Sequence, residues 1–406
     1  MSTHVSYLES AIDGTHLAAD TIQTLHRDRP IWVRYDLESV RAAVGPETIA
    51  GREPTLWRYR ELLPLPTRFE PVTLGEGMSP MLAAPTLARR LGLKQLWIKD
   101  ESQLPTGSFK SRGLAMAISM AHRFGVKRVA IPTAGNAGGA MAAYAARAGM
   151  EAYVFMPHDT PIVNQYECLV AGAKVHLVDG LINACGAIVR AGAEPMAWFD
   201  LSTLKEPYRI EGKKTMGLEL AEQFQWCLPD VILYPTGGGT GLIGMWKAFN
   251  ELRTLGWLRS DTMPRMISVQ SSGCAPIVRA FDQGERFGEP WQDAATCATG
   301  LRVPATVGDF MILDAIRESG GCAGAADEQR IQHAMRNAIA AEGISLCPES
   351  AACAVALEGL VADSTVGADD RIVLFNTGSA AKYVGAGSPD IPVISNPTEI
   401  DFTQWD

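Results

Sequence analysis

Short apolar runs alternate with amphipathic stretches along most of this chain. The apolar runs are typical of buried strands, and the stretches between them have the periodicity of helices. We expect strands at 95–99, 128–132, 152–156, 174–178, 231–234, 266–269 and 371–375. We expect helices at 85–91, 114–122, 137–148, 163–171, 182–191, 309–319, 328–342 and 349–362. Strands that alternate with helices of about 10–15 residues predict an α/β fold with parallel sheets.

Two stretches break this rhythm. Residues 1–60 are irregular and carry charged stretches, and we interpret them as an N-terminal extension that wraps the body. Residues 195–207 carry the weakest pattern and are a candidate crossover between two α/β domains. Two such domains leave a cleft between them, and ligands of α/β proteins usually bind in such a cleft.

Composition and charge narrow the class of protein. The 406 residues are 47% hydrophobic and 20% charged, and the formal net charge of −9 argues against a nucleic-acid partner. No apolar run approaches the roughly 18 residues of a membrane helix, and the N-terminus has no secretory pattern. The eight cysteines include no Cys-x-x-Cys pair and the histidines no His-Glu-x-x-His motif, so no metal is expected. We therefore expect a cytoplasmic protein with reduced thiols and no membrane contact.

The segment 104–113, Leu-Pro-Thr-Gly-Ser-Phe-Lys-Ser-Arg-Gly, is the most informative in the chain. A turn with Pro105 and Gly107 leads into a helical pattern, so Lys110 lies near a helix N-terminus. The positive end of the helix dipole and partial burial both favour the neutral amine. A neutral amine is the form of lysine that attacks an aldehyde. The alternative is an ordinary surface lysine, which apolar Phe109 and its small neighbours disfavour.

A glycine-rich loop, Gly237-Gly-Gly-Thr-Gly241, stands between an apolar run and a helical pattern. Consecutive glycines let backbone N–H groups turn toward one anion, and the helix start adds its dipole. A phosphate-binding loop is therefore predicted, and the alternative is a tight turn that binds nothing. Residues 239–244 also fit the dinucleotide pattern G-x-G-x-x-G, but the next strand ends in Gln270, where that fingerprint needs an acidic residue. An NAD oxidoreductase is accordingly disfavoured.

A second loop between a strand and a helix has the sequence Thr133-Ala-Gly-Asn-Ala-Gly138. Its amides can bind a substrate carboxylate, while Asn136 offers a donor and an acceptor to an oxygen on a ring. A helix cap is the alternative role for Asn136. Farther along, Asn-Thr-Gly-Ser follows a buried strand, so Thr377 or Ser379 could present a hydroxyl at the cleft.

Together these motifs resemble the tryptophan-synthase-like, fold type II enzymes that use pyridoxal 5′-phosphate. Four motifs occur in the family's order: Thr-Gly-Ser-Phe-Lys-Ser-Arg-Gly, Thr-Ala-Gly-Asn-Ala-Gly, Gly-Gly-Gly-Thr-Gly and Thr-Gly-Ser. The resemblance runs from about residue 74 to residue 383, and within the group the chain is similar to the threonine synthases. It implies two α/β domains with a cleft between them, and usually a homodimer. The implied larger domain at 61–115 and 215–395 carries the lysine and the phosphate loop, and the smaller one at 116–214 carries the asparagine loop.

The resemblance also implies a role for each motif. Lys110 forms the Schiff base with the cofactor, Asn136 contacts the 3′-oxygen of the ring, and Thr377 faces the pyridine nitrogen. The residues implied to hold the cofactor phosphate are Gly237, Gly238, Gly239, Thr240 and Gly241. The residues implied to hold the substrate carboxylate are Thr133, Ala134 and Gly135.

For a threonine synthase, the implied reaction of the amino-acid substrate is loss of phosphate from O-phosphohomoserine, followed by addition of water at Cβ. A neutral hydroxyl at the pyridine nitrogen leaves the ring a mild electron sink, which favours elimination and replacement over transamination. Three departures bear on the substrate. Ser111 follows the lysine where many threonine synthases have Asp, the loop after Asn136 reads Ala-Gly where many have Thr-Ser, and the phosphate loop is closer to that of serine/threonine dehydratases. A dehydratase or another β-eliminating or β-replacing enzyme is the first alternative, and a catalytically inactive ligand-binding member of the fold is another.

Five charged residues complete the set of candidates, and two of them, Glu211 and Lys213 in Arg-Ile-Glu-Gly-Lys-Lys-Thr, could line the cleft. Arg302, in Thr-Gly-Leu-Arg-Val-Pro, is a candidate for binding a substrate anion, and a structural ion pair is its alternative. Glu349, in Cys-Pro-Glu-Ser, is expected to stabilise a helix N-terminus. Arg112, two residues after the lysine, is expected to be structural.

Overall fold

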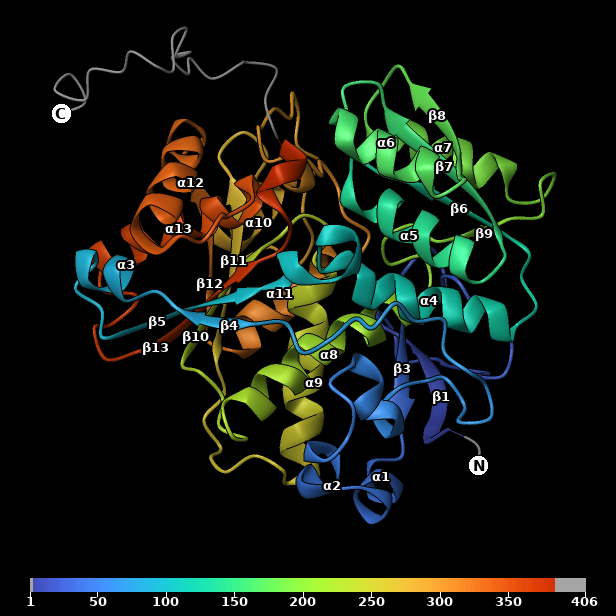
Figure 1. The fold of residues 1–406 in the computed structure, drawn as a ribbon, viewed down its shortest axis with the longest axis horizontal. Coiled ribbons are helices and arrows are strands. Elements are labelled where there is room, and N and C mark those ends of the chain that lie inside the picture. The colour runs from blue at the N-terminus through green and yellow to red at the C-terminus, as the bar shows by residue number, and fades with distance from the viewer. Residues whose placement is uncertain (1–2, 384–406) are drawn as a thin grey trace, which may run out of the picture.

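The structure, a computed structural model, describes residues 3–383, and within them the strands form three sheets surrounded by helices (Figure 1). A six-stranded sheet has the order β12-β11-β10-β13-β5-β4, and a four-stranded sheet has the order β8-β7-β6-β9. All neighbours in these two sheets pair in parallel except β4, which runs antiparallel to β5. The predicted α/β fold with parallel sheets is therefore confirmed.

Each expected strand and helix occurs, with its ends shifted by a few residues. The six-stranded sheet contains β4 (Met81–Ala83), β5 (Gln95–Asp100), β10 (Val231–Pro235), β11 (Arg265–Ser271), β12 (Cys322–Ala326) and β13 (Arg371–Asn376). The four-stranded sheet contains β6 (Arg128–Pro132), β7 (Glu151–Pro157), β8 (Lys174–Val178) and β9 (Phe199–Asp200). The helices are α3 (Pro85–Arg90), α4 (Lys110–Arg123), α5 (Asn136–Arg147), α6 (Ile162–Val170), α7 (Ile182–Gly192), α8 (Tyr208–Gln223), α9 (Thr240–Leu255), α10 (Pro276–Asp282), α11 (Asp309–Glu318), α12 (Glu328–Glu342) and α13 (Pro348–Ala362).

The N-terminal region is not irregular, so that expectation is wrong. β1 (Val5–Ser10) pairs with β2 (His16–Leu17) and β3 (Ile31–Tyr35) in an antiparallel sheet, and α1 (Leu37–Ala43) and α2 (Pro46–Ala50) follow. Leu8, Ile31 and Val33 of this sheet are buried in the core that also contains residues of α4 and α5. Leu8 is paired with Val33, far along the chain, and no local pattern shows that partner.

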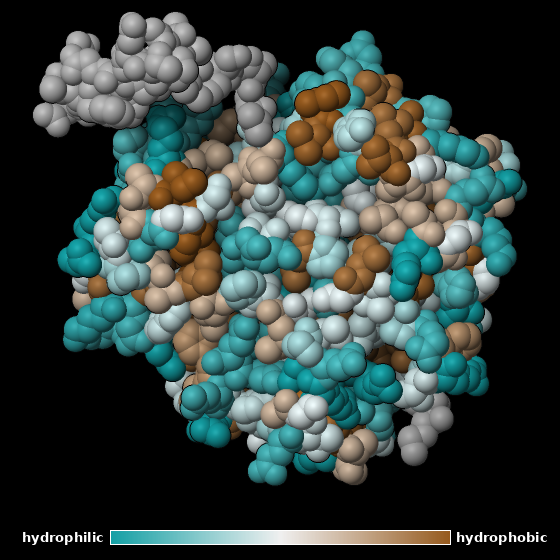
Figure 2. All heavy atoms as spheres, in the orientation of Figure 1, coloured by the Kyte–Doolittle hydropathy of each residue, from teal (hydrophilic) through white to brown (hydrophobic). Residues whose placement is uncertain are grey.

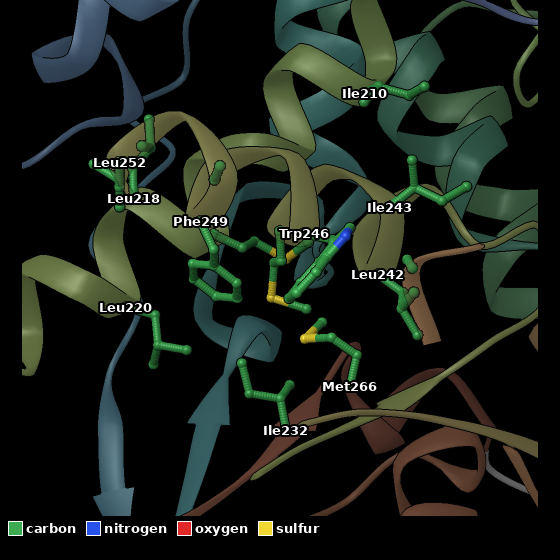
Figure 3. Close-up of a cluster of buried hydrophobic side chains, with 14 of the residues drawn as sticks. Ile210, Leu218, Leu220, Ile232, Leu242, Ile243, Trp246, Phe249, Leu252 and Met266 are labelled. Carbon is green, nitrogen blue, oxygen red and sulfur yellow. The ribbon is translucent and has the colours of Figure 1, made fainter. Parts of the chain in front are cut away.

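Helices α8 and α9 lie at the centre of the molecule, beside the six-stranded sheet (Figure 1). Figure 3 shows part of the core that joins them: Leu218 and Leu220 of α8 lie near Phe249 and Leu252 of α9, with Ile232 of β10 below. The sequence pattern does not predict α8, because charged residues interrupt its apolar positions. These charged residues are nevertheless buried, and they include Arg209, Glu211, Lys213, Lys214 and Glu219.

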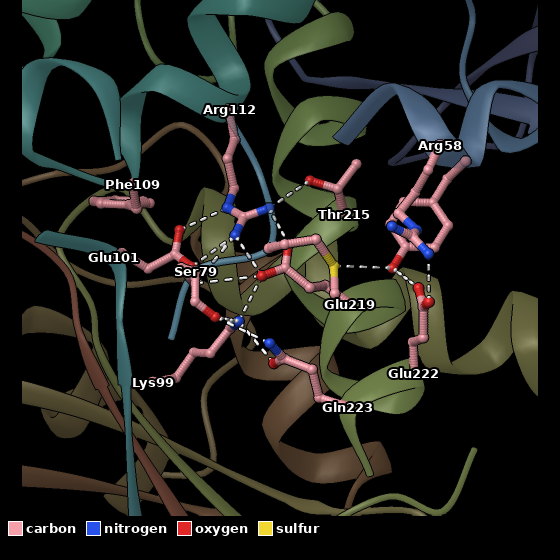
Figure 4. Close-up of polar contacts among 12 residues, drawn as sticks. Arg58, Ser79, Lys99, Glu101, Phe109, Arg112, Thr215, Glu219, Glu222 and Gln223 are labelled. Carbon is pink, nitrogen blue, oxygen red and sulfur yellow. Dashed lines mark hydrogen bonds and ion pairs between the residues drawn. The ribbon is translucent and has the colours of Figure 1, made fainter. Parts of the chain in front are cut away.

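A network of buried charges connects α8 to the start of α4 (Figure 4). Arg112 Nε donates to Glu101 at 2.6 Å and its Nη1 donates to Glu219 at 2.7 Å, while Lys99 Nζ also donates to Glu219. All four side chains are fully buried. Burial alone would raise the pKa of Glu219, but Arg112 and Lys99 lower that pKa to about 2. The network therefore carries its charges in the folded protein, and Arg112 has the structural position expected of it.

One face of α6 leaves apolar side chains in solvent, where Figure 2 shows them gathered. Ile162, Tyr166, Leu169 and Val170 are each more than half exposed, and their spacing places them on one side of the helix. Soluble monomers rarely expose a contiguous apolar patch of large size. Within residues 3–383, no helix is both long and apolar enough to cross a membrane.

The network predicts a large cost for removing one of its carboxylates. Glu219→Ala leaves Lys99 and Arg112 buried with one carboxylate fewer, and breaking a buried ion pair costs about 3–5 kcal/mol. We expect a loss of that order in the free energy of unfolding measured in urea. The control is Glu151→Ala, which removes an exposed carboxylate bound to Arg128 and Lys174 and is expected to cost far less, because water screens exposed ion pairs. Equal losses in the two variants would contradict the prediction.

Candidate functional site

A cavity of about 770 Å³ is lined by residues from both parallel sheets. The residues predicted from the motifs that line this cavity are Lys110, Thr133, Ala134, Gly135, Asn136, Gly237, Gly238, Gly239, Thr240, Gly241 and Thr377. Arg302 and Ser379 are not among the lining residues. The structure thus brings four separate motifs to one cavity, while the role of each residue toward a ligand stays a prediction.

Lys110 is the first residue of α4, as the turn before it predicts. Its Nζ lies 4.3 Å from the centroid of the Phe109 ring and has no hydrogen bond or ion pair with any described residue. Burial lowers the pKa of Lys110 to about 7, the positive charge of Arg209 adds to that effect, and the charge of Glu349 opposes it. A large fraction of this amine is therefore neutral near pH 7, the state in which it attacks an aldehyde.

Backbone contacts place the lysine segment beside the segment that carries Thr377. Phe109 N donates to Thr377 O at 3.0 Å, and Ser379 N donates to Gly107 O at 2.9 Å. From the other side, Lys213 Nζ donates to Phe109 O. Thr377 lines the cavity and Ser379 does not, so of the two hydroxyl residues Thr377 is the one at the cavity wall.

The Thr377 hydroxyl lies beside two neutral side chains. Its Oγ1 lies 3.5 Å from Ser350 Oγ and 3.7 Å from Cys347 Sγ. Burial raises the pKa of Cys347 to about 12, so this thiol is protonated at neutral pH. A ring nitrogen facing the Thr377 hydroxyl would therefore meet a neutral group at that point.

The glycine loop joins β10 to α9 and has the properties of an anion site. Among the described residues, no acceptor receives the backbone N–H groups of residues 237–241. Gly239 has a φ of 76°, in the left-handed region that favours glycine. A Cβ at Gly237 would lie 2.3 Å from Gly300 O, and a Cβ at Gly238 would lie 2.6 Å from Thr203 Cγ2. The glycines therefore leave the amides at the start of a long helix free for a phosphate.

Asn136 is the first residue of α5, and its side chain does not cap that helix. Its Nδ2 donates to Tyr383 OH at 3.2 Å, and its Oδ1 accepts from Asn164 at 3.3 Å. Thr133 instead binds the backbone at the start of α5, because its Oγ1 accepts hydrogen bonds from Gly135 N and Gly138 N. The N–H groups of residues 134, 136 and 137 have no acceptor among the described residues, and such free amides can bind a carboxylate.

Arg302 forms a structural ion pair, which is the alternative role given for it in the sequence analysis. Its guanidinium forms two bonds with Asp159, at 2.8 and 2.9 Å, and does not reach the cavity wall. Asp159 follows β7 of the four-stranded sheet, so the pair connects two parts of the chain that are distant in sequence. The observed ion pair favours a structural role.

Sequence reasoning missed two parts of the cavity wall. Glu349 lies in the first turn of α13 as expected, but its carboxylate accepts from Gly300 N and Tyr383 OH and not from its own helix. Tyr383 also lines the cavity and lies beyond the last expected strand. No local pattern distinguishes either residue, because both reach the cavity through contacts with distant segments.

This arrangement fits pyridoxal 5′-phosphate. It offers an amine of lowered pKa for the aldehyde, a set of free amides for the phosphate, and the Asn136 and Thr377 side chains for the ring. The cavity volume lies within the range of about 300–1,000 Å³ that is usual for small-molecule sites.

Comparisons with known proteins point in the same direction. The family model described as "Pyridoxal-phosphate dependent enzyme" matches residues 72–378. A threonine synthase from Methanosarcina acetivorans is 34% identical over 372 residues, which is 91% of this chain and 89% of that protein. A threonine synthase from Methanocaldococcus jannaschii is 33% identical over 86% of this chain and 85% of its own. The solved structure of maize serine racemase has a TM-score of 0.65 at 22% identity and covers 75% of this chain and 88% of that one, a likeness of fold alone.

The lowered pKa of Lys110 predicts how the protein without cofactor reacts with added pyridoxal 5′-phosphate. The rate of capture should follow the neutral fraction of the amine, so it should rise through pH 7 and then level off. An ordinary lysine would give a rate that rises until about pH 10. Stopped-flow measurement of visible absorption across this range checks the prediction, with Lys110→Ala as the blank. A rate that still rises above about pH 9 would contradict it.

The free amides of the glycine loop predict a loss of cofactor affinity when the loop is displaced. Gly237→Ala places a Cβ against Gly300 O, so the loop must move and its amides lose their alignment. We expect the Kd for pyridoxal 5′-phosphate to rise about tenfold or more, equivalent to about 1.4 kcal/mol. Gly359→Ala is the matched control, because Gly359 is exposed in α13 with no atom near its Cβ position. An unchanged Kd for Gly237→Ala in a fluorescence titration would count against the loop.

Proposed function

This chain belongs to the pyridoxal-phosphate-dependent enzymes and, within them, to the threonine synthases, and from this membership we propose that it converts O-phosphohomoserine and water to threonine and phosphate. The observation that carries the proposal is Lys110, a half-buried lysine with a pKa of about 7 in the wall of a cavity that also presents free phosphate-binding amides. The curated relatives named threonine synthase match this chain over most of its length.

In this reaction, the residues of the cavity transfer protons and orient the substrate, and the cofactor provides the remaining chemistry. When bound, pyridoxal 5′-phosphate supplies an aldehyde and an electron sink. Lys110 then removes a proton from the substrate Cα and returns one, since its pKa near 7 suits both directions. The free amides at residues 134, 136 and 137 orient the substrate carboxylate, and the neutral hydroxyl of Thr377 favours elimination and replacement at Cβ or Cγ over transamination.

The cavity also has positive charge for a phosphorylated substrate. Arg190 and Lys205 line it in addition to Lys110. Arg190 has no ion-pair partner among the described residues, so its guanidinium is free to bind a phosphate group. This supports a phosphorylated amino acid as the substrate.

A serine/threonine dehydratase is the second candidate. The observation that favours it is the asparagine loop, in which Ala137 and Gly138 follow Asn136 and provide no hydroxyl for a polar substrate. A dehydratase would release a 2-oxo acid and ammonia from serine or threonine without any phosphate.

We also propose that the enzyme is a homodimer in the cytoplasm. The apolar face of α6, with Ile162, Tyr166, Leu169 and Val170 in solvent, supports burial against another subunit. All eight cysteines are free, which supports a reducing compartment.

We retain as a proposal the division into a larger domain, at 61–115 and 215–395, and a smaller one at 116–214. All strands of the four-stranded sheet lie between residues 128 and 200, which supports the smaller domain. Residues 384–395 of the larger one lie outside the described residues.

Substrate profiling of the enzyme with bound cofactor tests the proposed reaction. We expect release of phosphate from O-phosphohomoserine, and little 2-oxo acid from L-serine or L-threonine. Lys110→Ala should abolish turnover together with the visible absorption of the bound cofactor, because Lys205, the other lysine of the cavity wall among the described residues, is paired with Asp200. Lys94→Ala, which removes an exposed lysine paired with Asp369, is the matched control and should retain both. Release of 2-oxo acid without phosphate would replace the first candidate by the second.

A further inference from the structure

Glu349 is a buried carboxylate in the cavity wall with one oxygen unused. Its side chain is buried at the start of α13 and lines the same cavity as Lys110. Its Oε1 accepts hydrogen bonds from Gly300 N at 2.8 Å and from Tyr383 OH at 2.9 Å. Its Oε2 is buried and has no hydrogen-bond partner among residues 3–383. A buried charged oxygen without a partner is costly, so this oxygen has the properties of a group that awaits a cation or a donor.

Two hydrogen bonds hold the Glu349 carboxylate in position. Tyr383 OH accepts from Asn136 Nδ2, so its single hydrogen is available to donate to Glu349. Burial and the charge of Glu349 both raise the pKa of Tyr383, which keeps the phenol protonated as that donor. On the other side, a Cβ at Gly300 would lie 2.8 Å from Glu349 Oε1, so the carboxylate fills the available space.

Among the described residues that line the cavity, Glu349 is the buried carboxylate that could balance a positive charge on Lys110. In the part of the chain that the structure describes, the carboxylates that line the cavity are Asp293, which is exposed, and Glu349. The charged or titratable neighbours of Lys110 on α8 are Arg209 and Lys213, neither of which can supply a negative charge. Burial raises the pKa of Cys347 and Cys297, near Glu349, to about 12, so these thiols are also uncharged at neutral pH.

We propose that Glu349 is a positioning residue that provides the counter-charge of the Lys110 nitrogen and keeps that nitrogen protonated while it holds the cofactor. A positive nitrogen in the cavity wall is stabilised by an anion in the same wall, and the buried Oε2 of Glu349 is such an anion without a partner among the described residues. Glu349 already opposes the effect of burial on the pKa of Lys110. The inference concerns the cofactor pocket and does not depend on which amino acid is the substrate.

A spectroscopic pH titration of the enzyme with bound cofactor tests this role. The protonated and deprotonated cofactor-bound nitrogen differ in visible absorption, so the midpoint of the titration reports its proton affinity without any turnover. Glu349→Gln should lower the midpoint by about one pH unit or more, a tenfold loss of proton affinity, because the amide keeps the shape but not the charge. Glu349→Asp keeps the charge and should retain most of the wild-type midpoint. If the wild type does not titrate below about pH 10, the glutamine variant should bring the transition into range.

Two further variants separate counter-charge from structural support. Asp293→Asn removes the exposed carboxylate of the cavity and should leave the midpoint unchanged. Gly300→Ala retains every charge but forces the Glu349 carboxylate to move, so it should lower the midpoint even where Glu349→Gln fails to bind the cofactor. A residue that only supports the fold would change the thermal stability and leave the midpoint in place. The proposal is overturned by an unchanged midpoint in Glu349→Gln, or in Gly300→Ala if the first variant does not bind cofactor.

Discussion

Arg112 is held between Glu101 and Glu219, and this buried pairing determines where Lys110 lies. Glu101 follows β5, Glu219 is on α8, and Arg112 is in the first turn of α4, so three elements meet in one geometry. Ion pairs in a low-dielectric interior lose much energy when they separate, which makes this junction rigid. Residues two apart on a helix point to different sides. Arg112 therefore enters the core while Lys110 enters the cavity.

Lys99 and Lys214 differ from Lys110 in that a carboxylate contacts their nitrogens. Lys99 contacts Glu219, and Lys214 contacts Glu211 and Glu251, so these lysines stay paired inside the fold. Among residues 3–383, Lys110 has no such partner in contact, and burial lowers its pKa to about 7. The same loss of hydration that makes a paired lysine structural makes an unpaired one reactive. The reactivity of Lys110 thus follows from the lack of a contacting carboxylate at its nitrogen among the described residues.

The parts of the fold that the sequence pattern misses share one cause. Helix α8 has charged residues at buried positions. These residues can be buried because other elements supply ion-pair partners, and Arg112 of α4 is the partner of Glu219. The N-terminal strands likewise depend on a pairing such as Leu8 with Val33. Hydrophobic periodicity reports only the order of apolar and polar residues within one segment and contains no information on that segment's partners. It predicts elements that bury their own apolar faces and misses those that bury charge or rely on distant pairing.

The sequence by itself determined the alternation of strands and helices, the position of Lys110 at a helix start, and the glycine loop of residues 237–241. These features depend on local needs: apolar faces, turn residues, and backbone amides left free where a helix begins. Only the tertiary structure decided that Thr377 and not Ser379 reaches the cavity, that Arg302 pairs with Asp159, and that Glu349 and Tyr383 complete the wall. Each of these outcomes depends on contacts between segments far apart in the chain, and such contacts leave no local pattern.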